Sequence, residues 1–317
     1  YNTVGGTNAG DSFSGTDAEK NTLFGYDAGT ALTTADGNTI LGYQAGKDIT
    51  TGSDIILIGK NAGESLTTTG DALGLGQWAL STCTTGSQNT ALGNNALQNT
   101  STGSNNTAVG SGTLYSNTTG SDNIAIGRQC LVLNTTASYN VGIGRHALGA
   151  NTTGGTNTAI GYHALKANTT GFNNSLLGKD AGLAITTGER NSGVGVGVFE
   201  KLTTGTKNVA IGDYALGNTT SADKNTCIGY NAGYGLSGNN AENNTLIGNG
   251  AAPSSASVNN EITLGDTSIT KFRVPGLNFS IKSSTATDNY VLTVDANGDA
   301  GWEAAAGGGL DSDSQYN

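Results

Sequence analysis

The sequence predicts an all-β protein, a parallel β-solenoid (β-roll) of about sixteen coils with a 17-residue period. Three observations predict this fold. Glycines recur at a constant spacing behind an aliphatic residue, the apolar stretches are too short for helices, and the composition has 51 Gly with only 6% aromatic and 12% charged residues. Self-similarity at a fixed period indicates coils that bury their apolar faces by stacking.

The coils are defined by anchor glycines, each of which follows the aliphatic residue. Twelve consecutive steps of 17 connect Gly25, Gly42, Gly59, Gly76, Gly93, Gly110, Gly127, Gly144, Gly161, Gly178, Gly195, Gly212 and Gly229. Gly6 and Gly248 join at steps of 19, and Gly265 follows at 17. Strands stacked at about 4.8 Å per coil would form a rod of roughly 70 Å.

Three columns of each coil carry structural expectations. The residue before the anchor glycine is Phe, Leu, Ile or Val in every coil but the first, which predicts that this column is the core. Asn occupies the fourth position before the anchor glycine in 13 of 16 coils, which predicts an internal ladder of amide hydrogen bonds. The anchor glycines are expected at corners that need a positive φ.

The strand also predicts association with other copies of the chain. Neighbouring residues in a strand point to opposite faces, so the columns one and two positions before the anchor glycine cannot share a face. Both are apolar, and the second is often small, as at Ala91, Ala108 and Ala125. If the large column fills the coil, the small column is left to approach neighbouring copies, which predicts a homotrimer.

The period ends near Asp266, which divides the chain into a solenoid shaft (1–266), a small C-terminal β-hairpin segment (267–305) and a Gly-rich linker to a following module (306–317). The hairpin is expected around Asn297-Gly298. Asp295, Asn297 and Asp299 superficially suggest a Ca²⁺ loop. Ala300 and Ala306 stand where an EF-hand needs Gly and Glu, so no calcium site is predicted.

Composition excludes several functions. A formal charge of −10 with only 14 dispersed Lys and Arg argues against nucleic-acid binding. No apolar run approaches a membrane span, so no membrane insertion is expected. Cys83, Cys130 and Cys227 form neither a disulfide framework nor a metal motif, and small buried side chains are expected there. No cofactor is predicted.

The repeated Asn-Thr-Ala-Ile-Gly-x-x-Ala, at residues 89–96 and 157–164, resembles the motif of the YadA-type head domains of trimeric autotransporter adhesins. That family forms left-handed parallel β-rolls as trimers with a usual 14-residue repeat, so the 17-residue period departs from it. The longer coil, with 260–265 and 290–298, resembles tail-fibre proteins of marine and cyanobacterial phages. This resemblance implies a virion fibre that displays receptor-binding surfaces.

Candidate contact residues cluster behind the anchor glycines. Aromatic and cationic side chains there are typical of binding surfaces, although a solvated turn explains them as well. These candidate receptor contacts are Tyr26, Tyr43, Trp78, Arg128, Arg145, Tyr162 and Tyr230. His146 and His163 are one period apart and are the candidate metal ligands, with a solvated corner as the alternative.

No catalytic residues are predicted, because the chain lacks a Ser-His-Asp order, a phosphate loop and a His-Cys-Asp cluster. A polysaccharide-degrading spike that uses carboxylates such as Asp180, Glu189 and Glu200 is one alternative. Ice binding is disfavoured, because adjacent residues such as Thr50 and Thr51 point to opposite faces.

The expected function is therefore a non-enzymatic trimeric fibre segment of a phage virion. Its expected partners are other fibre proteins at the ends and a host surface glycan or protein. A bacterial cell-surface adhesin is the alternative.

Overall fold

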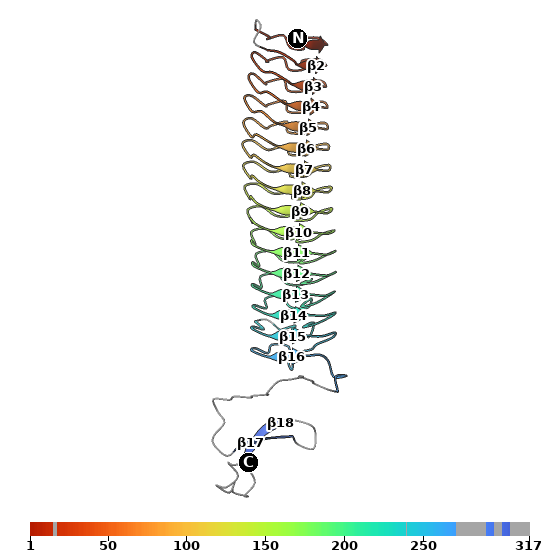
Figure 1. Ribbon diagram of the computed structural model, residues 1–317, viewed down its shortest axis with the longest axis vertical. Helices are drawn as coiled ribbons and strands as arrows, with labels where there is room; N and C mark the ends of the chain where they lie inside the picture. The colour runs from red at the N-terminus through yellow and green to blue at the C-terminus, as the bar shows by residue number, and fades with distance from the viewer. Residues whose placement is uncertain (15–17, 239, 271–289, 295–299, 305–317) are drawn as a thin grey trace, which may run out of the picture. The chain divides into compact units, whose positions relative to one another are not determined.

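The computed structural model describes residues 1–14, 18–238, 240–270, 290–294 and 300–304. Two compact units are present, residues 1–269 and 270–317. The first unit is a β-solenoid whose sixteen short strands form one parallel sheet in sequence order (Figure 1). This confirms the predicted fold class and its period.

Each coil contributes one three-residue strand that ends directly before the anchor glycine. The strands are β1 (Thr3–Gly5), β2 (Thr22–Phe24), β3 (Thr39–Leu41), β4 (Ile56–Ile58), β5 (Leu73–Leu75), β6 (Thr90–Leu92), β7 (Thr107–Val109), β8 (Ile124–Ile126), β9 (Val141–Ile143), β10 (Thr158–Ile160), β11 (Ser175–Leu177), β12 (Ser192–Val194), β13 (Val209–Ile211), β14 (Thr226–Ile228), β15 (Thr245–Ile247) and β16 (Ile262–Leu264).

The register between strands follows the sequence repeat. Thr158 pairs with Ser175 and Ile160 with Leu177, so each residue pairs with the residue one period further along the chain. Every column of the sequence is thus a column in space. Residues that share a repeat position lie directly above one another.

The strand faces are the reverse of those expected. The small middle residue points into the coil, as at Ala125 with no exposed surface, whereas Ile126 beside it is 38% exposed and Leu177 is 47% exposed. The prediction that the large aliphatic column is the core was wrong. So was the inference that the small column faces other copies.

The small column faces inward because a second side chain shares its space. That side chain lies four positions after the anchor glycine, and the two positions compensate in volume. Leu176 is matched by Gly182, and Gly193 by Phe199; a Cβ on Gly182 would lie 2.2 Å from Leu176 Cδ1. The same exchange operates in Leu23 with Gly29, Ile40 with Gly46, Leu57 with Gly63, Ala125 with Leu131, and Cys227 with Gly233. Each coil therefore keeps a nearly constant core volume, as close packing requires.

The predicted asparagine ladder is present and buried. Asn174 illustrates it: its backbone N–H donates to Asn157 Oδ1 at 2.9 Å, and its Nδ2 donates to Gly188 O at 2.9 Å. The ladder continues by the same backbone contact along Asn89, Asn106, Asn123, Asn140, Asn157, Asn174, Asn191, Asn208, Asn225 and Asn244. These amides satisfy backbone groups that would otherwise be buried without partners.

A second ladder was not predicted from the sequence. Asn134, Asn151 and Asn168 each donate from Nδ2 to the Oδ1 of the asparagine one coil earlier, at 2.8–2.9 Å, beginning with Asn117. The next residue in the column is Ile185, which has no donor to offer. Asn168 Oδ1 consequently lacks a hydrogen-bond partner within the described part of the chain.

The anchor glycines adopt the expected positive φ, which is 146° at Gly178. Their conformation brings consecutive coils into backbone contact, because a Cβ on Gly178 would lie 2.1 Å from the carbonyl oxygen of Gly195. Any larger residue would separate the coils at this corner.

The three cysteines are buried and unpaired. Burial raises the pKa of the Cys83 thiol to about 11 and the pKa values of Cys130 and Cys227 to about 12. Such thiols stay protonated at neutral pH and serve as small apolar side chains.

In the second unit, β17 (Tyr290–Val294) and β18 (Ala300–Ala304) pair antiparallel, with Leu292 opposite Trp302. The expected Asn297-Gly298 turn, the Asp295, Asn297 and Asp299 group and the Gly-rich linker lie outside the described residues.

The volume exchange in the core predicts a compensating double substitution. Leu176→Ala should lower the free energy of unfolding by about 3 kcal/mol, because it empties space that Gly182 cannot fill. Adding Gly182→Leu should recover more than half of that loss. Leucine is compatible with the backbone there, since Leu165 holds φ 50° and Gly182 holds φ 61°. Chemical denaturation of the native chain, the two single variants and the double variant measures the coupling free energy between the two positions. Additive changes in the free energy of unfolding would contradict the volume exchange.

The asparagine ladder predicts a large cost for one amide. Asn157→Ala leaves the backbone N–H of Asn174 without its side-chain acceptor. It also removes one of the two side-chain donors to the carbonyl of Gly171, the other being Asn168 Nδ2. The expected loss is between about 2 and 4 kcal/mol in the free energy of unfolding. The exposed Asn249→Ala is the matched control, with an expected change within about 0.5 kcal/mol. Similar values for the two variants would show that the ladder does not stabilise the fold.

Candidate functional site

The candidate contact residues lie on one corner of the coil, directly after the anchor glycine. We call the residue after the anchor glycine the first corner column and the next residue the second corner column. In the second column Gln44, Asn95 and His146 have φ between 53° and 59°, so the chain turns sharply there. Backbone bonds hold each turn to the previous one, as Gln44 N–H donates to Tyr26 O at 2.8 Å.

The structure places all seven predicted receptor contacts on the solvent-exposed surface of this corner. The aromatic members are between 37% and 53% exposed, and Arg128 and Arg145 are exposed as well. They lie in separate coils, so they form a line and no single closed site.

Two groups within this line are in contact. Near the N-terminus, Tyr26 and Tyr43 stack with ring centroids 5.3 Å apart, and Lys60 lies 5.8 Å from the centre of the Tyr43 ring. Further along, Tyr162 stacks on His163 at 3.7 Å, and Arg145 lies 6.0 Å from the centre of the Tyr162 ring. These contacts hold exposed rings in fixed orientations.

The two candidate metal ligands are neighbours in the second corner column. The His146 and His163 rings are 5.5 Å apart, and His163 Nδ1 lies 3.4 Å from Asp180 Oδ1. Across the described ranges of the chain, no group of three or more His, Cys, Asp or Glu side chains is arranged to hold a metal ion. The histidines stay candidates from the sequence alone.

Positive charge gathers on and beside this corner. Between residues 72 and 179 Asp122 is the single acidic residue, and it lies at the other end of β8 from Arg128. The basic residues of that stretch are Arg128, Arg145, Lys166 and Lys179. Its formal net charge is therefore +3, four basic residues minus one acidic residue, whereas the formal net charge of the whole chain is −10. We call these four residues, with His146 and His163, the basic band.

The basic band perturbs its own histidines. Partial burial and then the charge of Arg145 lower the pKa of His146, with further contributions from His163, Lys166 and Arg128. Partial burial and then Lys166 lower the pKa of His163, against the opposing carboxylate of Asp180. Arg145 and Lys166 thus lie within electrostatic reach of both histidines.

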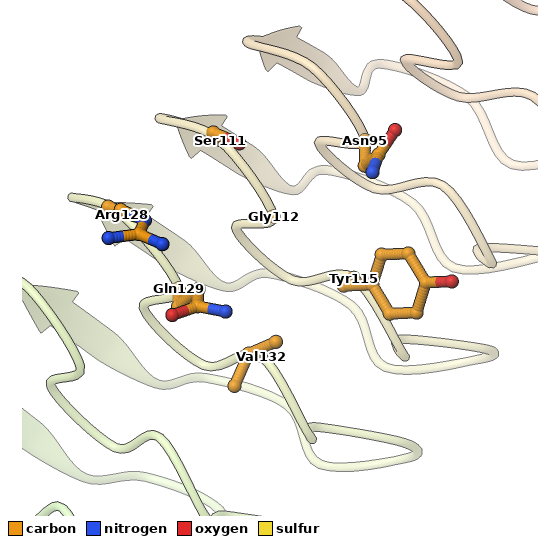
Figure 2. A pocket seen from close by; sticks show the side chains of 7 residues that line it. All are labelled: Asn95, Ser111, Gly112, Tyr115, Arg128, Gln129 and Val132. Carbon is orange, nitrogen blue, oxygen red and sulfur yellow. The ribbon is translucent and has the colours of Figure 1, made fainter.

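A notch interrupts the corner at one end of the basic band. Its volume is about 390 Å³, and it is lined by Asn95, Ser111, Gly112, Tyr115, Arg128, Gln129 and Val132. Figure 2 shows Asn95 from the coil of β6 on one side of bare Gly112, and Arg128 and Gln129 from the coil of β8 on the other. The notch exists because Ser111 and Gly112 are the smallest pair in the two corner columns.

Three polar side chains of the notch have unused hydrogen-bonding capacity. Elsewhere in the second corner column Gln44 Nε2 donates to Asp27 Oδ2 at 3.3 Å, and Asn61 Nδ2 donates to Glu64 Oε2 at 2.7 Å. By contrast, Asn95, Gln129 and Arg128 make no side-chain hydrogen bond or ion pair with the residues that the structure describes. They are free to bind a ligand.

Sequence reasoning missed this notch although its signal was present. It found Arg128 as one member of a line but attached no meaning to the adjacent Ser111-Gly112. A Ser-Gly pair in two columns that mostly hold larger polar or aromatic residues indicates a gap in the surface. The remaining candidates, Trp78 and Tyr230, lie outside both groups.

Comparison of the chain with protein-family models, curated proteins and solved structures found no match. Among the described residues, no helix is long and apolar enough to cross a membrane. Function is therefore inferred from the geometry of the chain itself.

The pKa shifts of the two histidines give a direct test. Because the chain has two histidines in total, NMR titration should resolve both, with midpoints below the ordinary value of 6.5. Their contribution to stability is then complete above pH 6.5 and is lost as the pH falls through the lowered folded-state pKa values. Lys166→Gln should raise both midpoints. Unchanged midpoints would contradict the clustering of charge.

Proposed function

We propose that this chain is a non-enzymatic structural and adhesive segment of a fibre, built as a parallel homotrimer that spaces or presents contacts to a cell surface. One observation carries the proposal. The outward face of the sheet is an uninterrupted strip of apolar, threonine and serine side chains that runs the length of the solenoid.

The strip, which we call the aliphatic strip, consists of the first and third residues of strands β2 to β16. Its third-residue column includes Phe24, Ile58, Ile126, Leu177, Ile211 and Ile247, each at least 38% exposed. Its first-residue column is Thr, Ser, Ile, Leu or Val, so no charged residue interrupts either column. Its length of roughly 70 Å and width of about 10 Å give an area near 700 Å². Monomeric proteins rarely expose more than a few hundred Å² of contiguous apolar surface.

Another copy of the same chain is the best occupant of this strip. The side chains repeat at the strand spacing of about 4.8 Å, so a partner must present apolar groups at that pitch over many coils. A second solenoid of this sequence satisfies that condition in every coil. Around a three-fold axis each strip contacts the strips of both other copies, and cyclic symmetry of this kind forms a closed assembly.

The resemblance to phage tail fibres supports a place on a virion, with other fibre proteins at the ends and a host glycan or protein as the contact. A bacterial cell-surface adhesin is the alternative location. A rigid rod with a buried seam and variable outer corners suits either role. Its stiffness comes from continuous hydrogen-bonded ladders between coils, and its contacts repeat along the shaft.

Light scattering tests the proposed assembly. The native chain should have a mass of about 95 kDa, three times 31.7 kDa. Ile126→Asp combined with Ile211→Asp should give a monomer with an unchanged circular dichroism spectrum, because like charges would meet at the axis.

The control for this experiment is Leu133→Asp, since Leu133 is 49% exposed but lies off the aliphatic strip. It should leave the mass unchanged. A native monomer would overturn the proposal, and a dimer would overturn its three-fold symmetry.

A further inference from the structure

We propose that the notch at Gly112 and the basic band beside it form a binding site for an anionic saccharide, one whose sugar units carry carboxylate or phosphate groups. The inference deepens the proposed adhesive function, and it rests on that function for its biological setting. Its physical basis is independent, because it depends on one face of a single chain.

The charge distribution favours an anionic ligand. The described chain outside residues 72–179 is rich in Asp and Glu, whereas this stretch has Asp122 alone, at the far end of β8 from the corner. Arg128 has no carboxylate partner within the described residues, and Lys179 has Asp180 at 3.6 Å. An anion that approaches the rod therefore meets its most favourable potential at this corner.

The notch supplies the groups that recognise sugar hydroxyls. Asn95 and Gln129 carry amides that donate and accept hydrogen bonds, and Arg128 presents a planar guanidinium that can form two parallel bonds to a carboxylate or phosphate. Tyr115 and Val132 also line the notch. A concave site in which polar groups converge beside some apolar surface suits a small polar ligand.

The basic band extends the site beyond one sugar unit. From Ser111 to Lys179 the corner spans four coil steps, roughly 19 Å at the strand spacing. Tyr162 lies within that span, is 41% exposed and is held by His163 and Arg145. Its exposed ring offers a flat surface for a sugar ring between the charged groups.

A saccharide explains these groups better than a nucleic acid does. Four cations over four coil steps are few for a phosphate backbone, because duplex DNA has a far denser and continuous row of charges. The rest of the chain is acidic, which would repel such a backbone. The neutral amides and the phenol have no role in backbone neutralisation. They match the hydroxyl-rich surface of a glycan.

Isothermal titration calorimetry on the full chain tests the site. The probes are oligogalacturonate for the carboxylates, a phosphorylated mannan oligosaccharide for the phosphates, a malto-oligosaccharide as the neutral glycan, inorganic phosphate, and a short DNA duplex. At least one of the two anionic glycans should bind. The difference between their affinities identifies whether the site prefers carboxylate or phosphate groups. The neutral glycan and free phosphate should bind at least tenfold more weakly.

Two variants localise the binding. Gly112→Asn fills the notch with a residue that the backbone accepts, because Asn95 has φ 59° in the same column and Gly112 has φ 66°; a Cβ there would meet only Gln129 Cγ, at 3.5 Å. It should abolish binding without lowering the melting temperature. Arg128→Gln should weaken binding about tenfold or more.

Lys207→Gln is the matched control, since it removes one exposed cation from another part of the rod. It should leave the affinity unchanged. Binding that survives Gly112→Asn, an equal loss with Lys207→Gln, equal affinity for duplex DNA, or no binding of either anionic glycan would each overturn the proposal. Failure of the saccharide site can be distinguished from failure of the trimer by measuring the mass with light scattering. The notch lies on a corner and not on the aliphatic strip, so the notch variants should leave the mass unchanged.

Discussion

The structure depends on the direct stacking of each coil on the next, in a register that brings the anchor glycines into backbone contact. A Cβ at Gly161 would lie 2.2 Å from the carbonyl oxygen of Gly178, so the absence of a side chain sets the distance between coils at that corner. Once this contact and the parallel strand bonds are made, all residues at one repeat position become vertical neighbours. Asparagines then form ladders, aromatic rings stack and like charges accumulate, because a repeat in sequence has become a repeat in space.

Stacking constrains the inside of the coil far more than the outside. The interior holds a fixed volume, so a large residue at one position requires glycine at the other, as with Leu57 and Gly63. The ladders add a second condition, because a buried amide must find a partner in the adjacent coil; Asn168 shows the consequence where the column changes to Ile185. No such condition acts on the corner columns. Their residues vary from Tyr to Asp to Gly without disturbing the stack.

The fold was predictable from the sequence because the period identifies the coil, and a column of Asn repeated from coil to coil predicts a ladder of amide hydrogen bonds. Which face of the strand points inward was not predictable. Both strand columns are apolar, and alternation alone does not say which one lies in the core. Size suggested the wrong answer: Ile160 looks like a core residue and Ala159 does not. The deciding information was the residue four positions after the anchor glycine, Leu165, which occupies the space that a larger residue in place of Ala159 would need. At the candidate site, the columns were predictable, but the notch required attention to the smallest members, Ser111 and Gly112, and not to the largest.

This difference between a constrained interior and a free corner indicates where specificity arises on a repetitive rod. A strip that matched a second copy would keep its character in every coil, and the outward columns of β2 to β16 are uncharged throughout. A recognition site needs a departure from the repeat, since identical coils cannot distinguish one level of the rod from another. Gly112 with the adjacent basic band is such a departure in both shape and charge. Three copies in register would carry three of these notches at one level, so a glycan with repeated anionic groups can engage several at once, and weak individual contacts then combine into firm attachment.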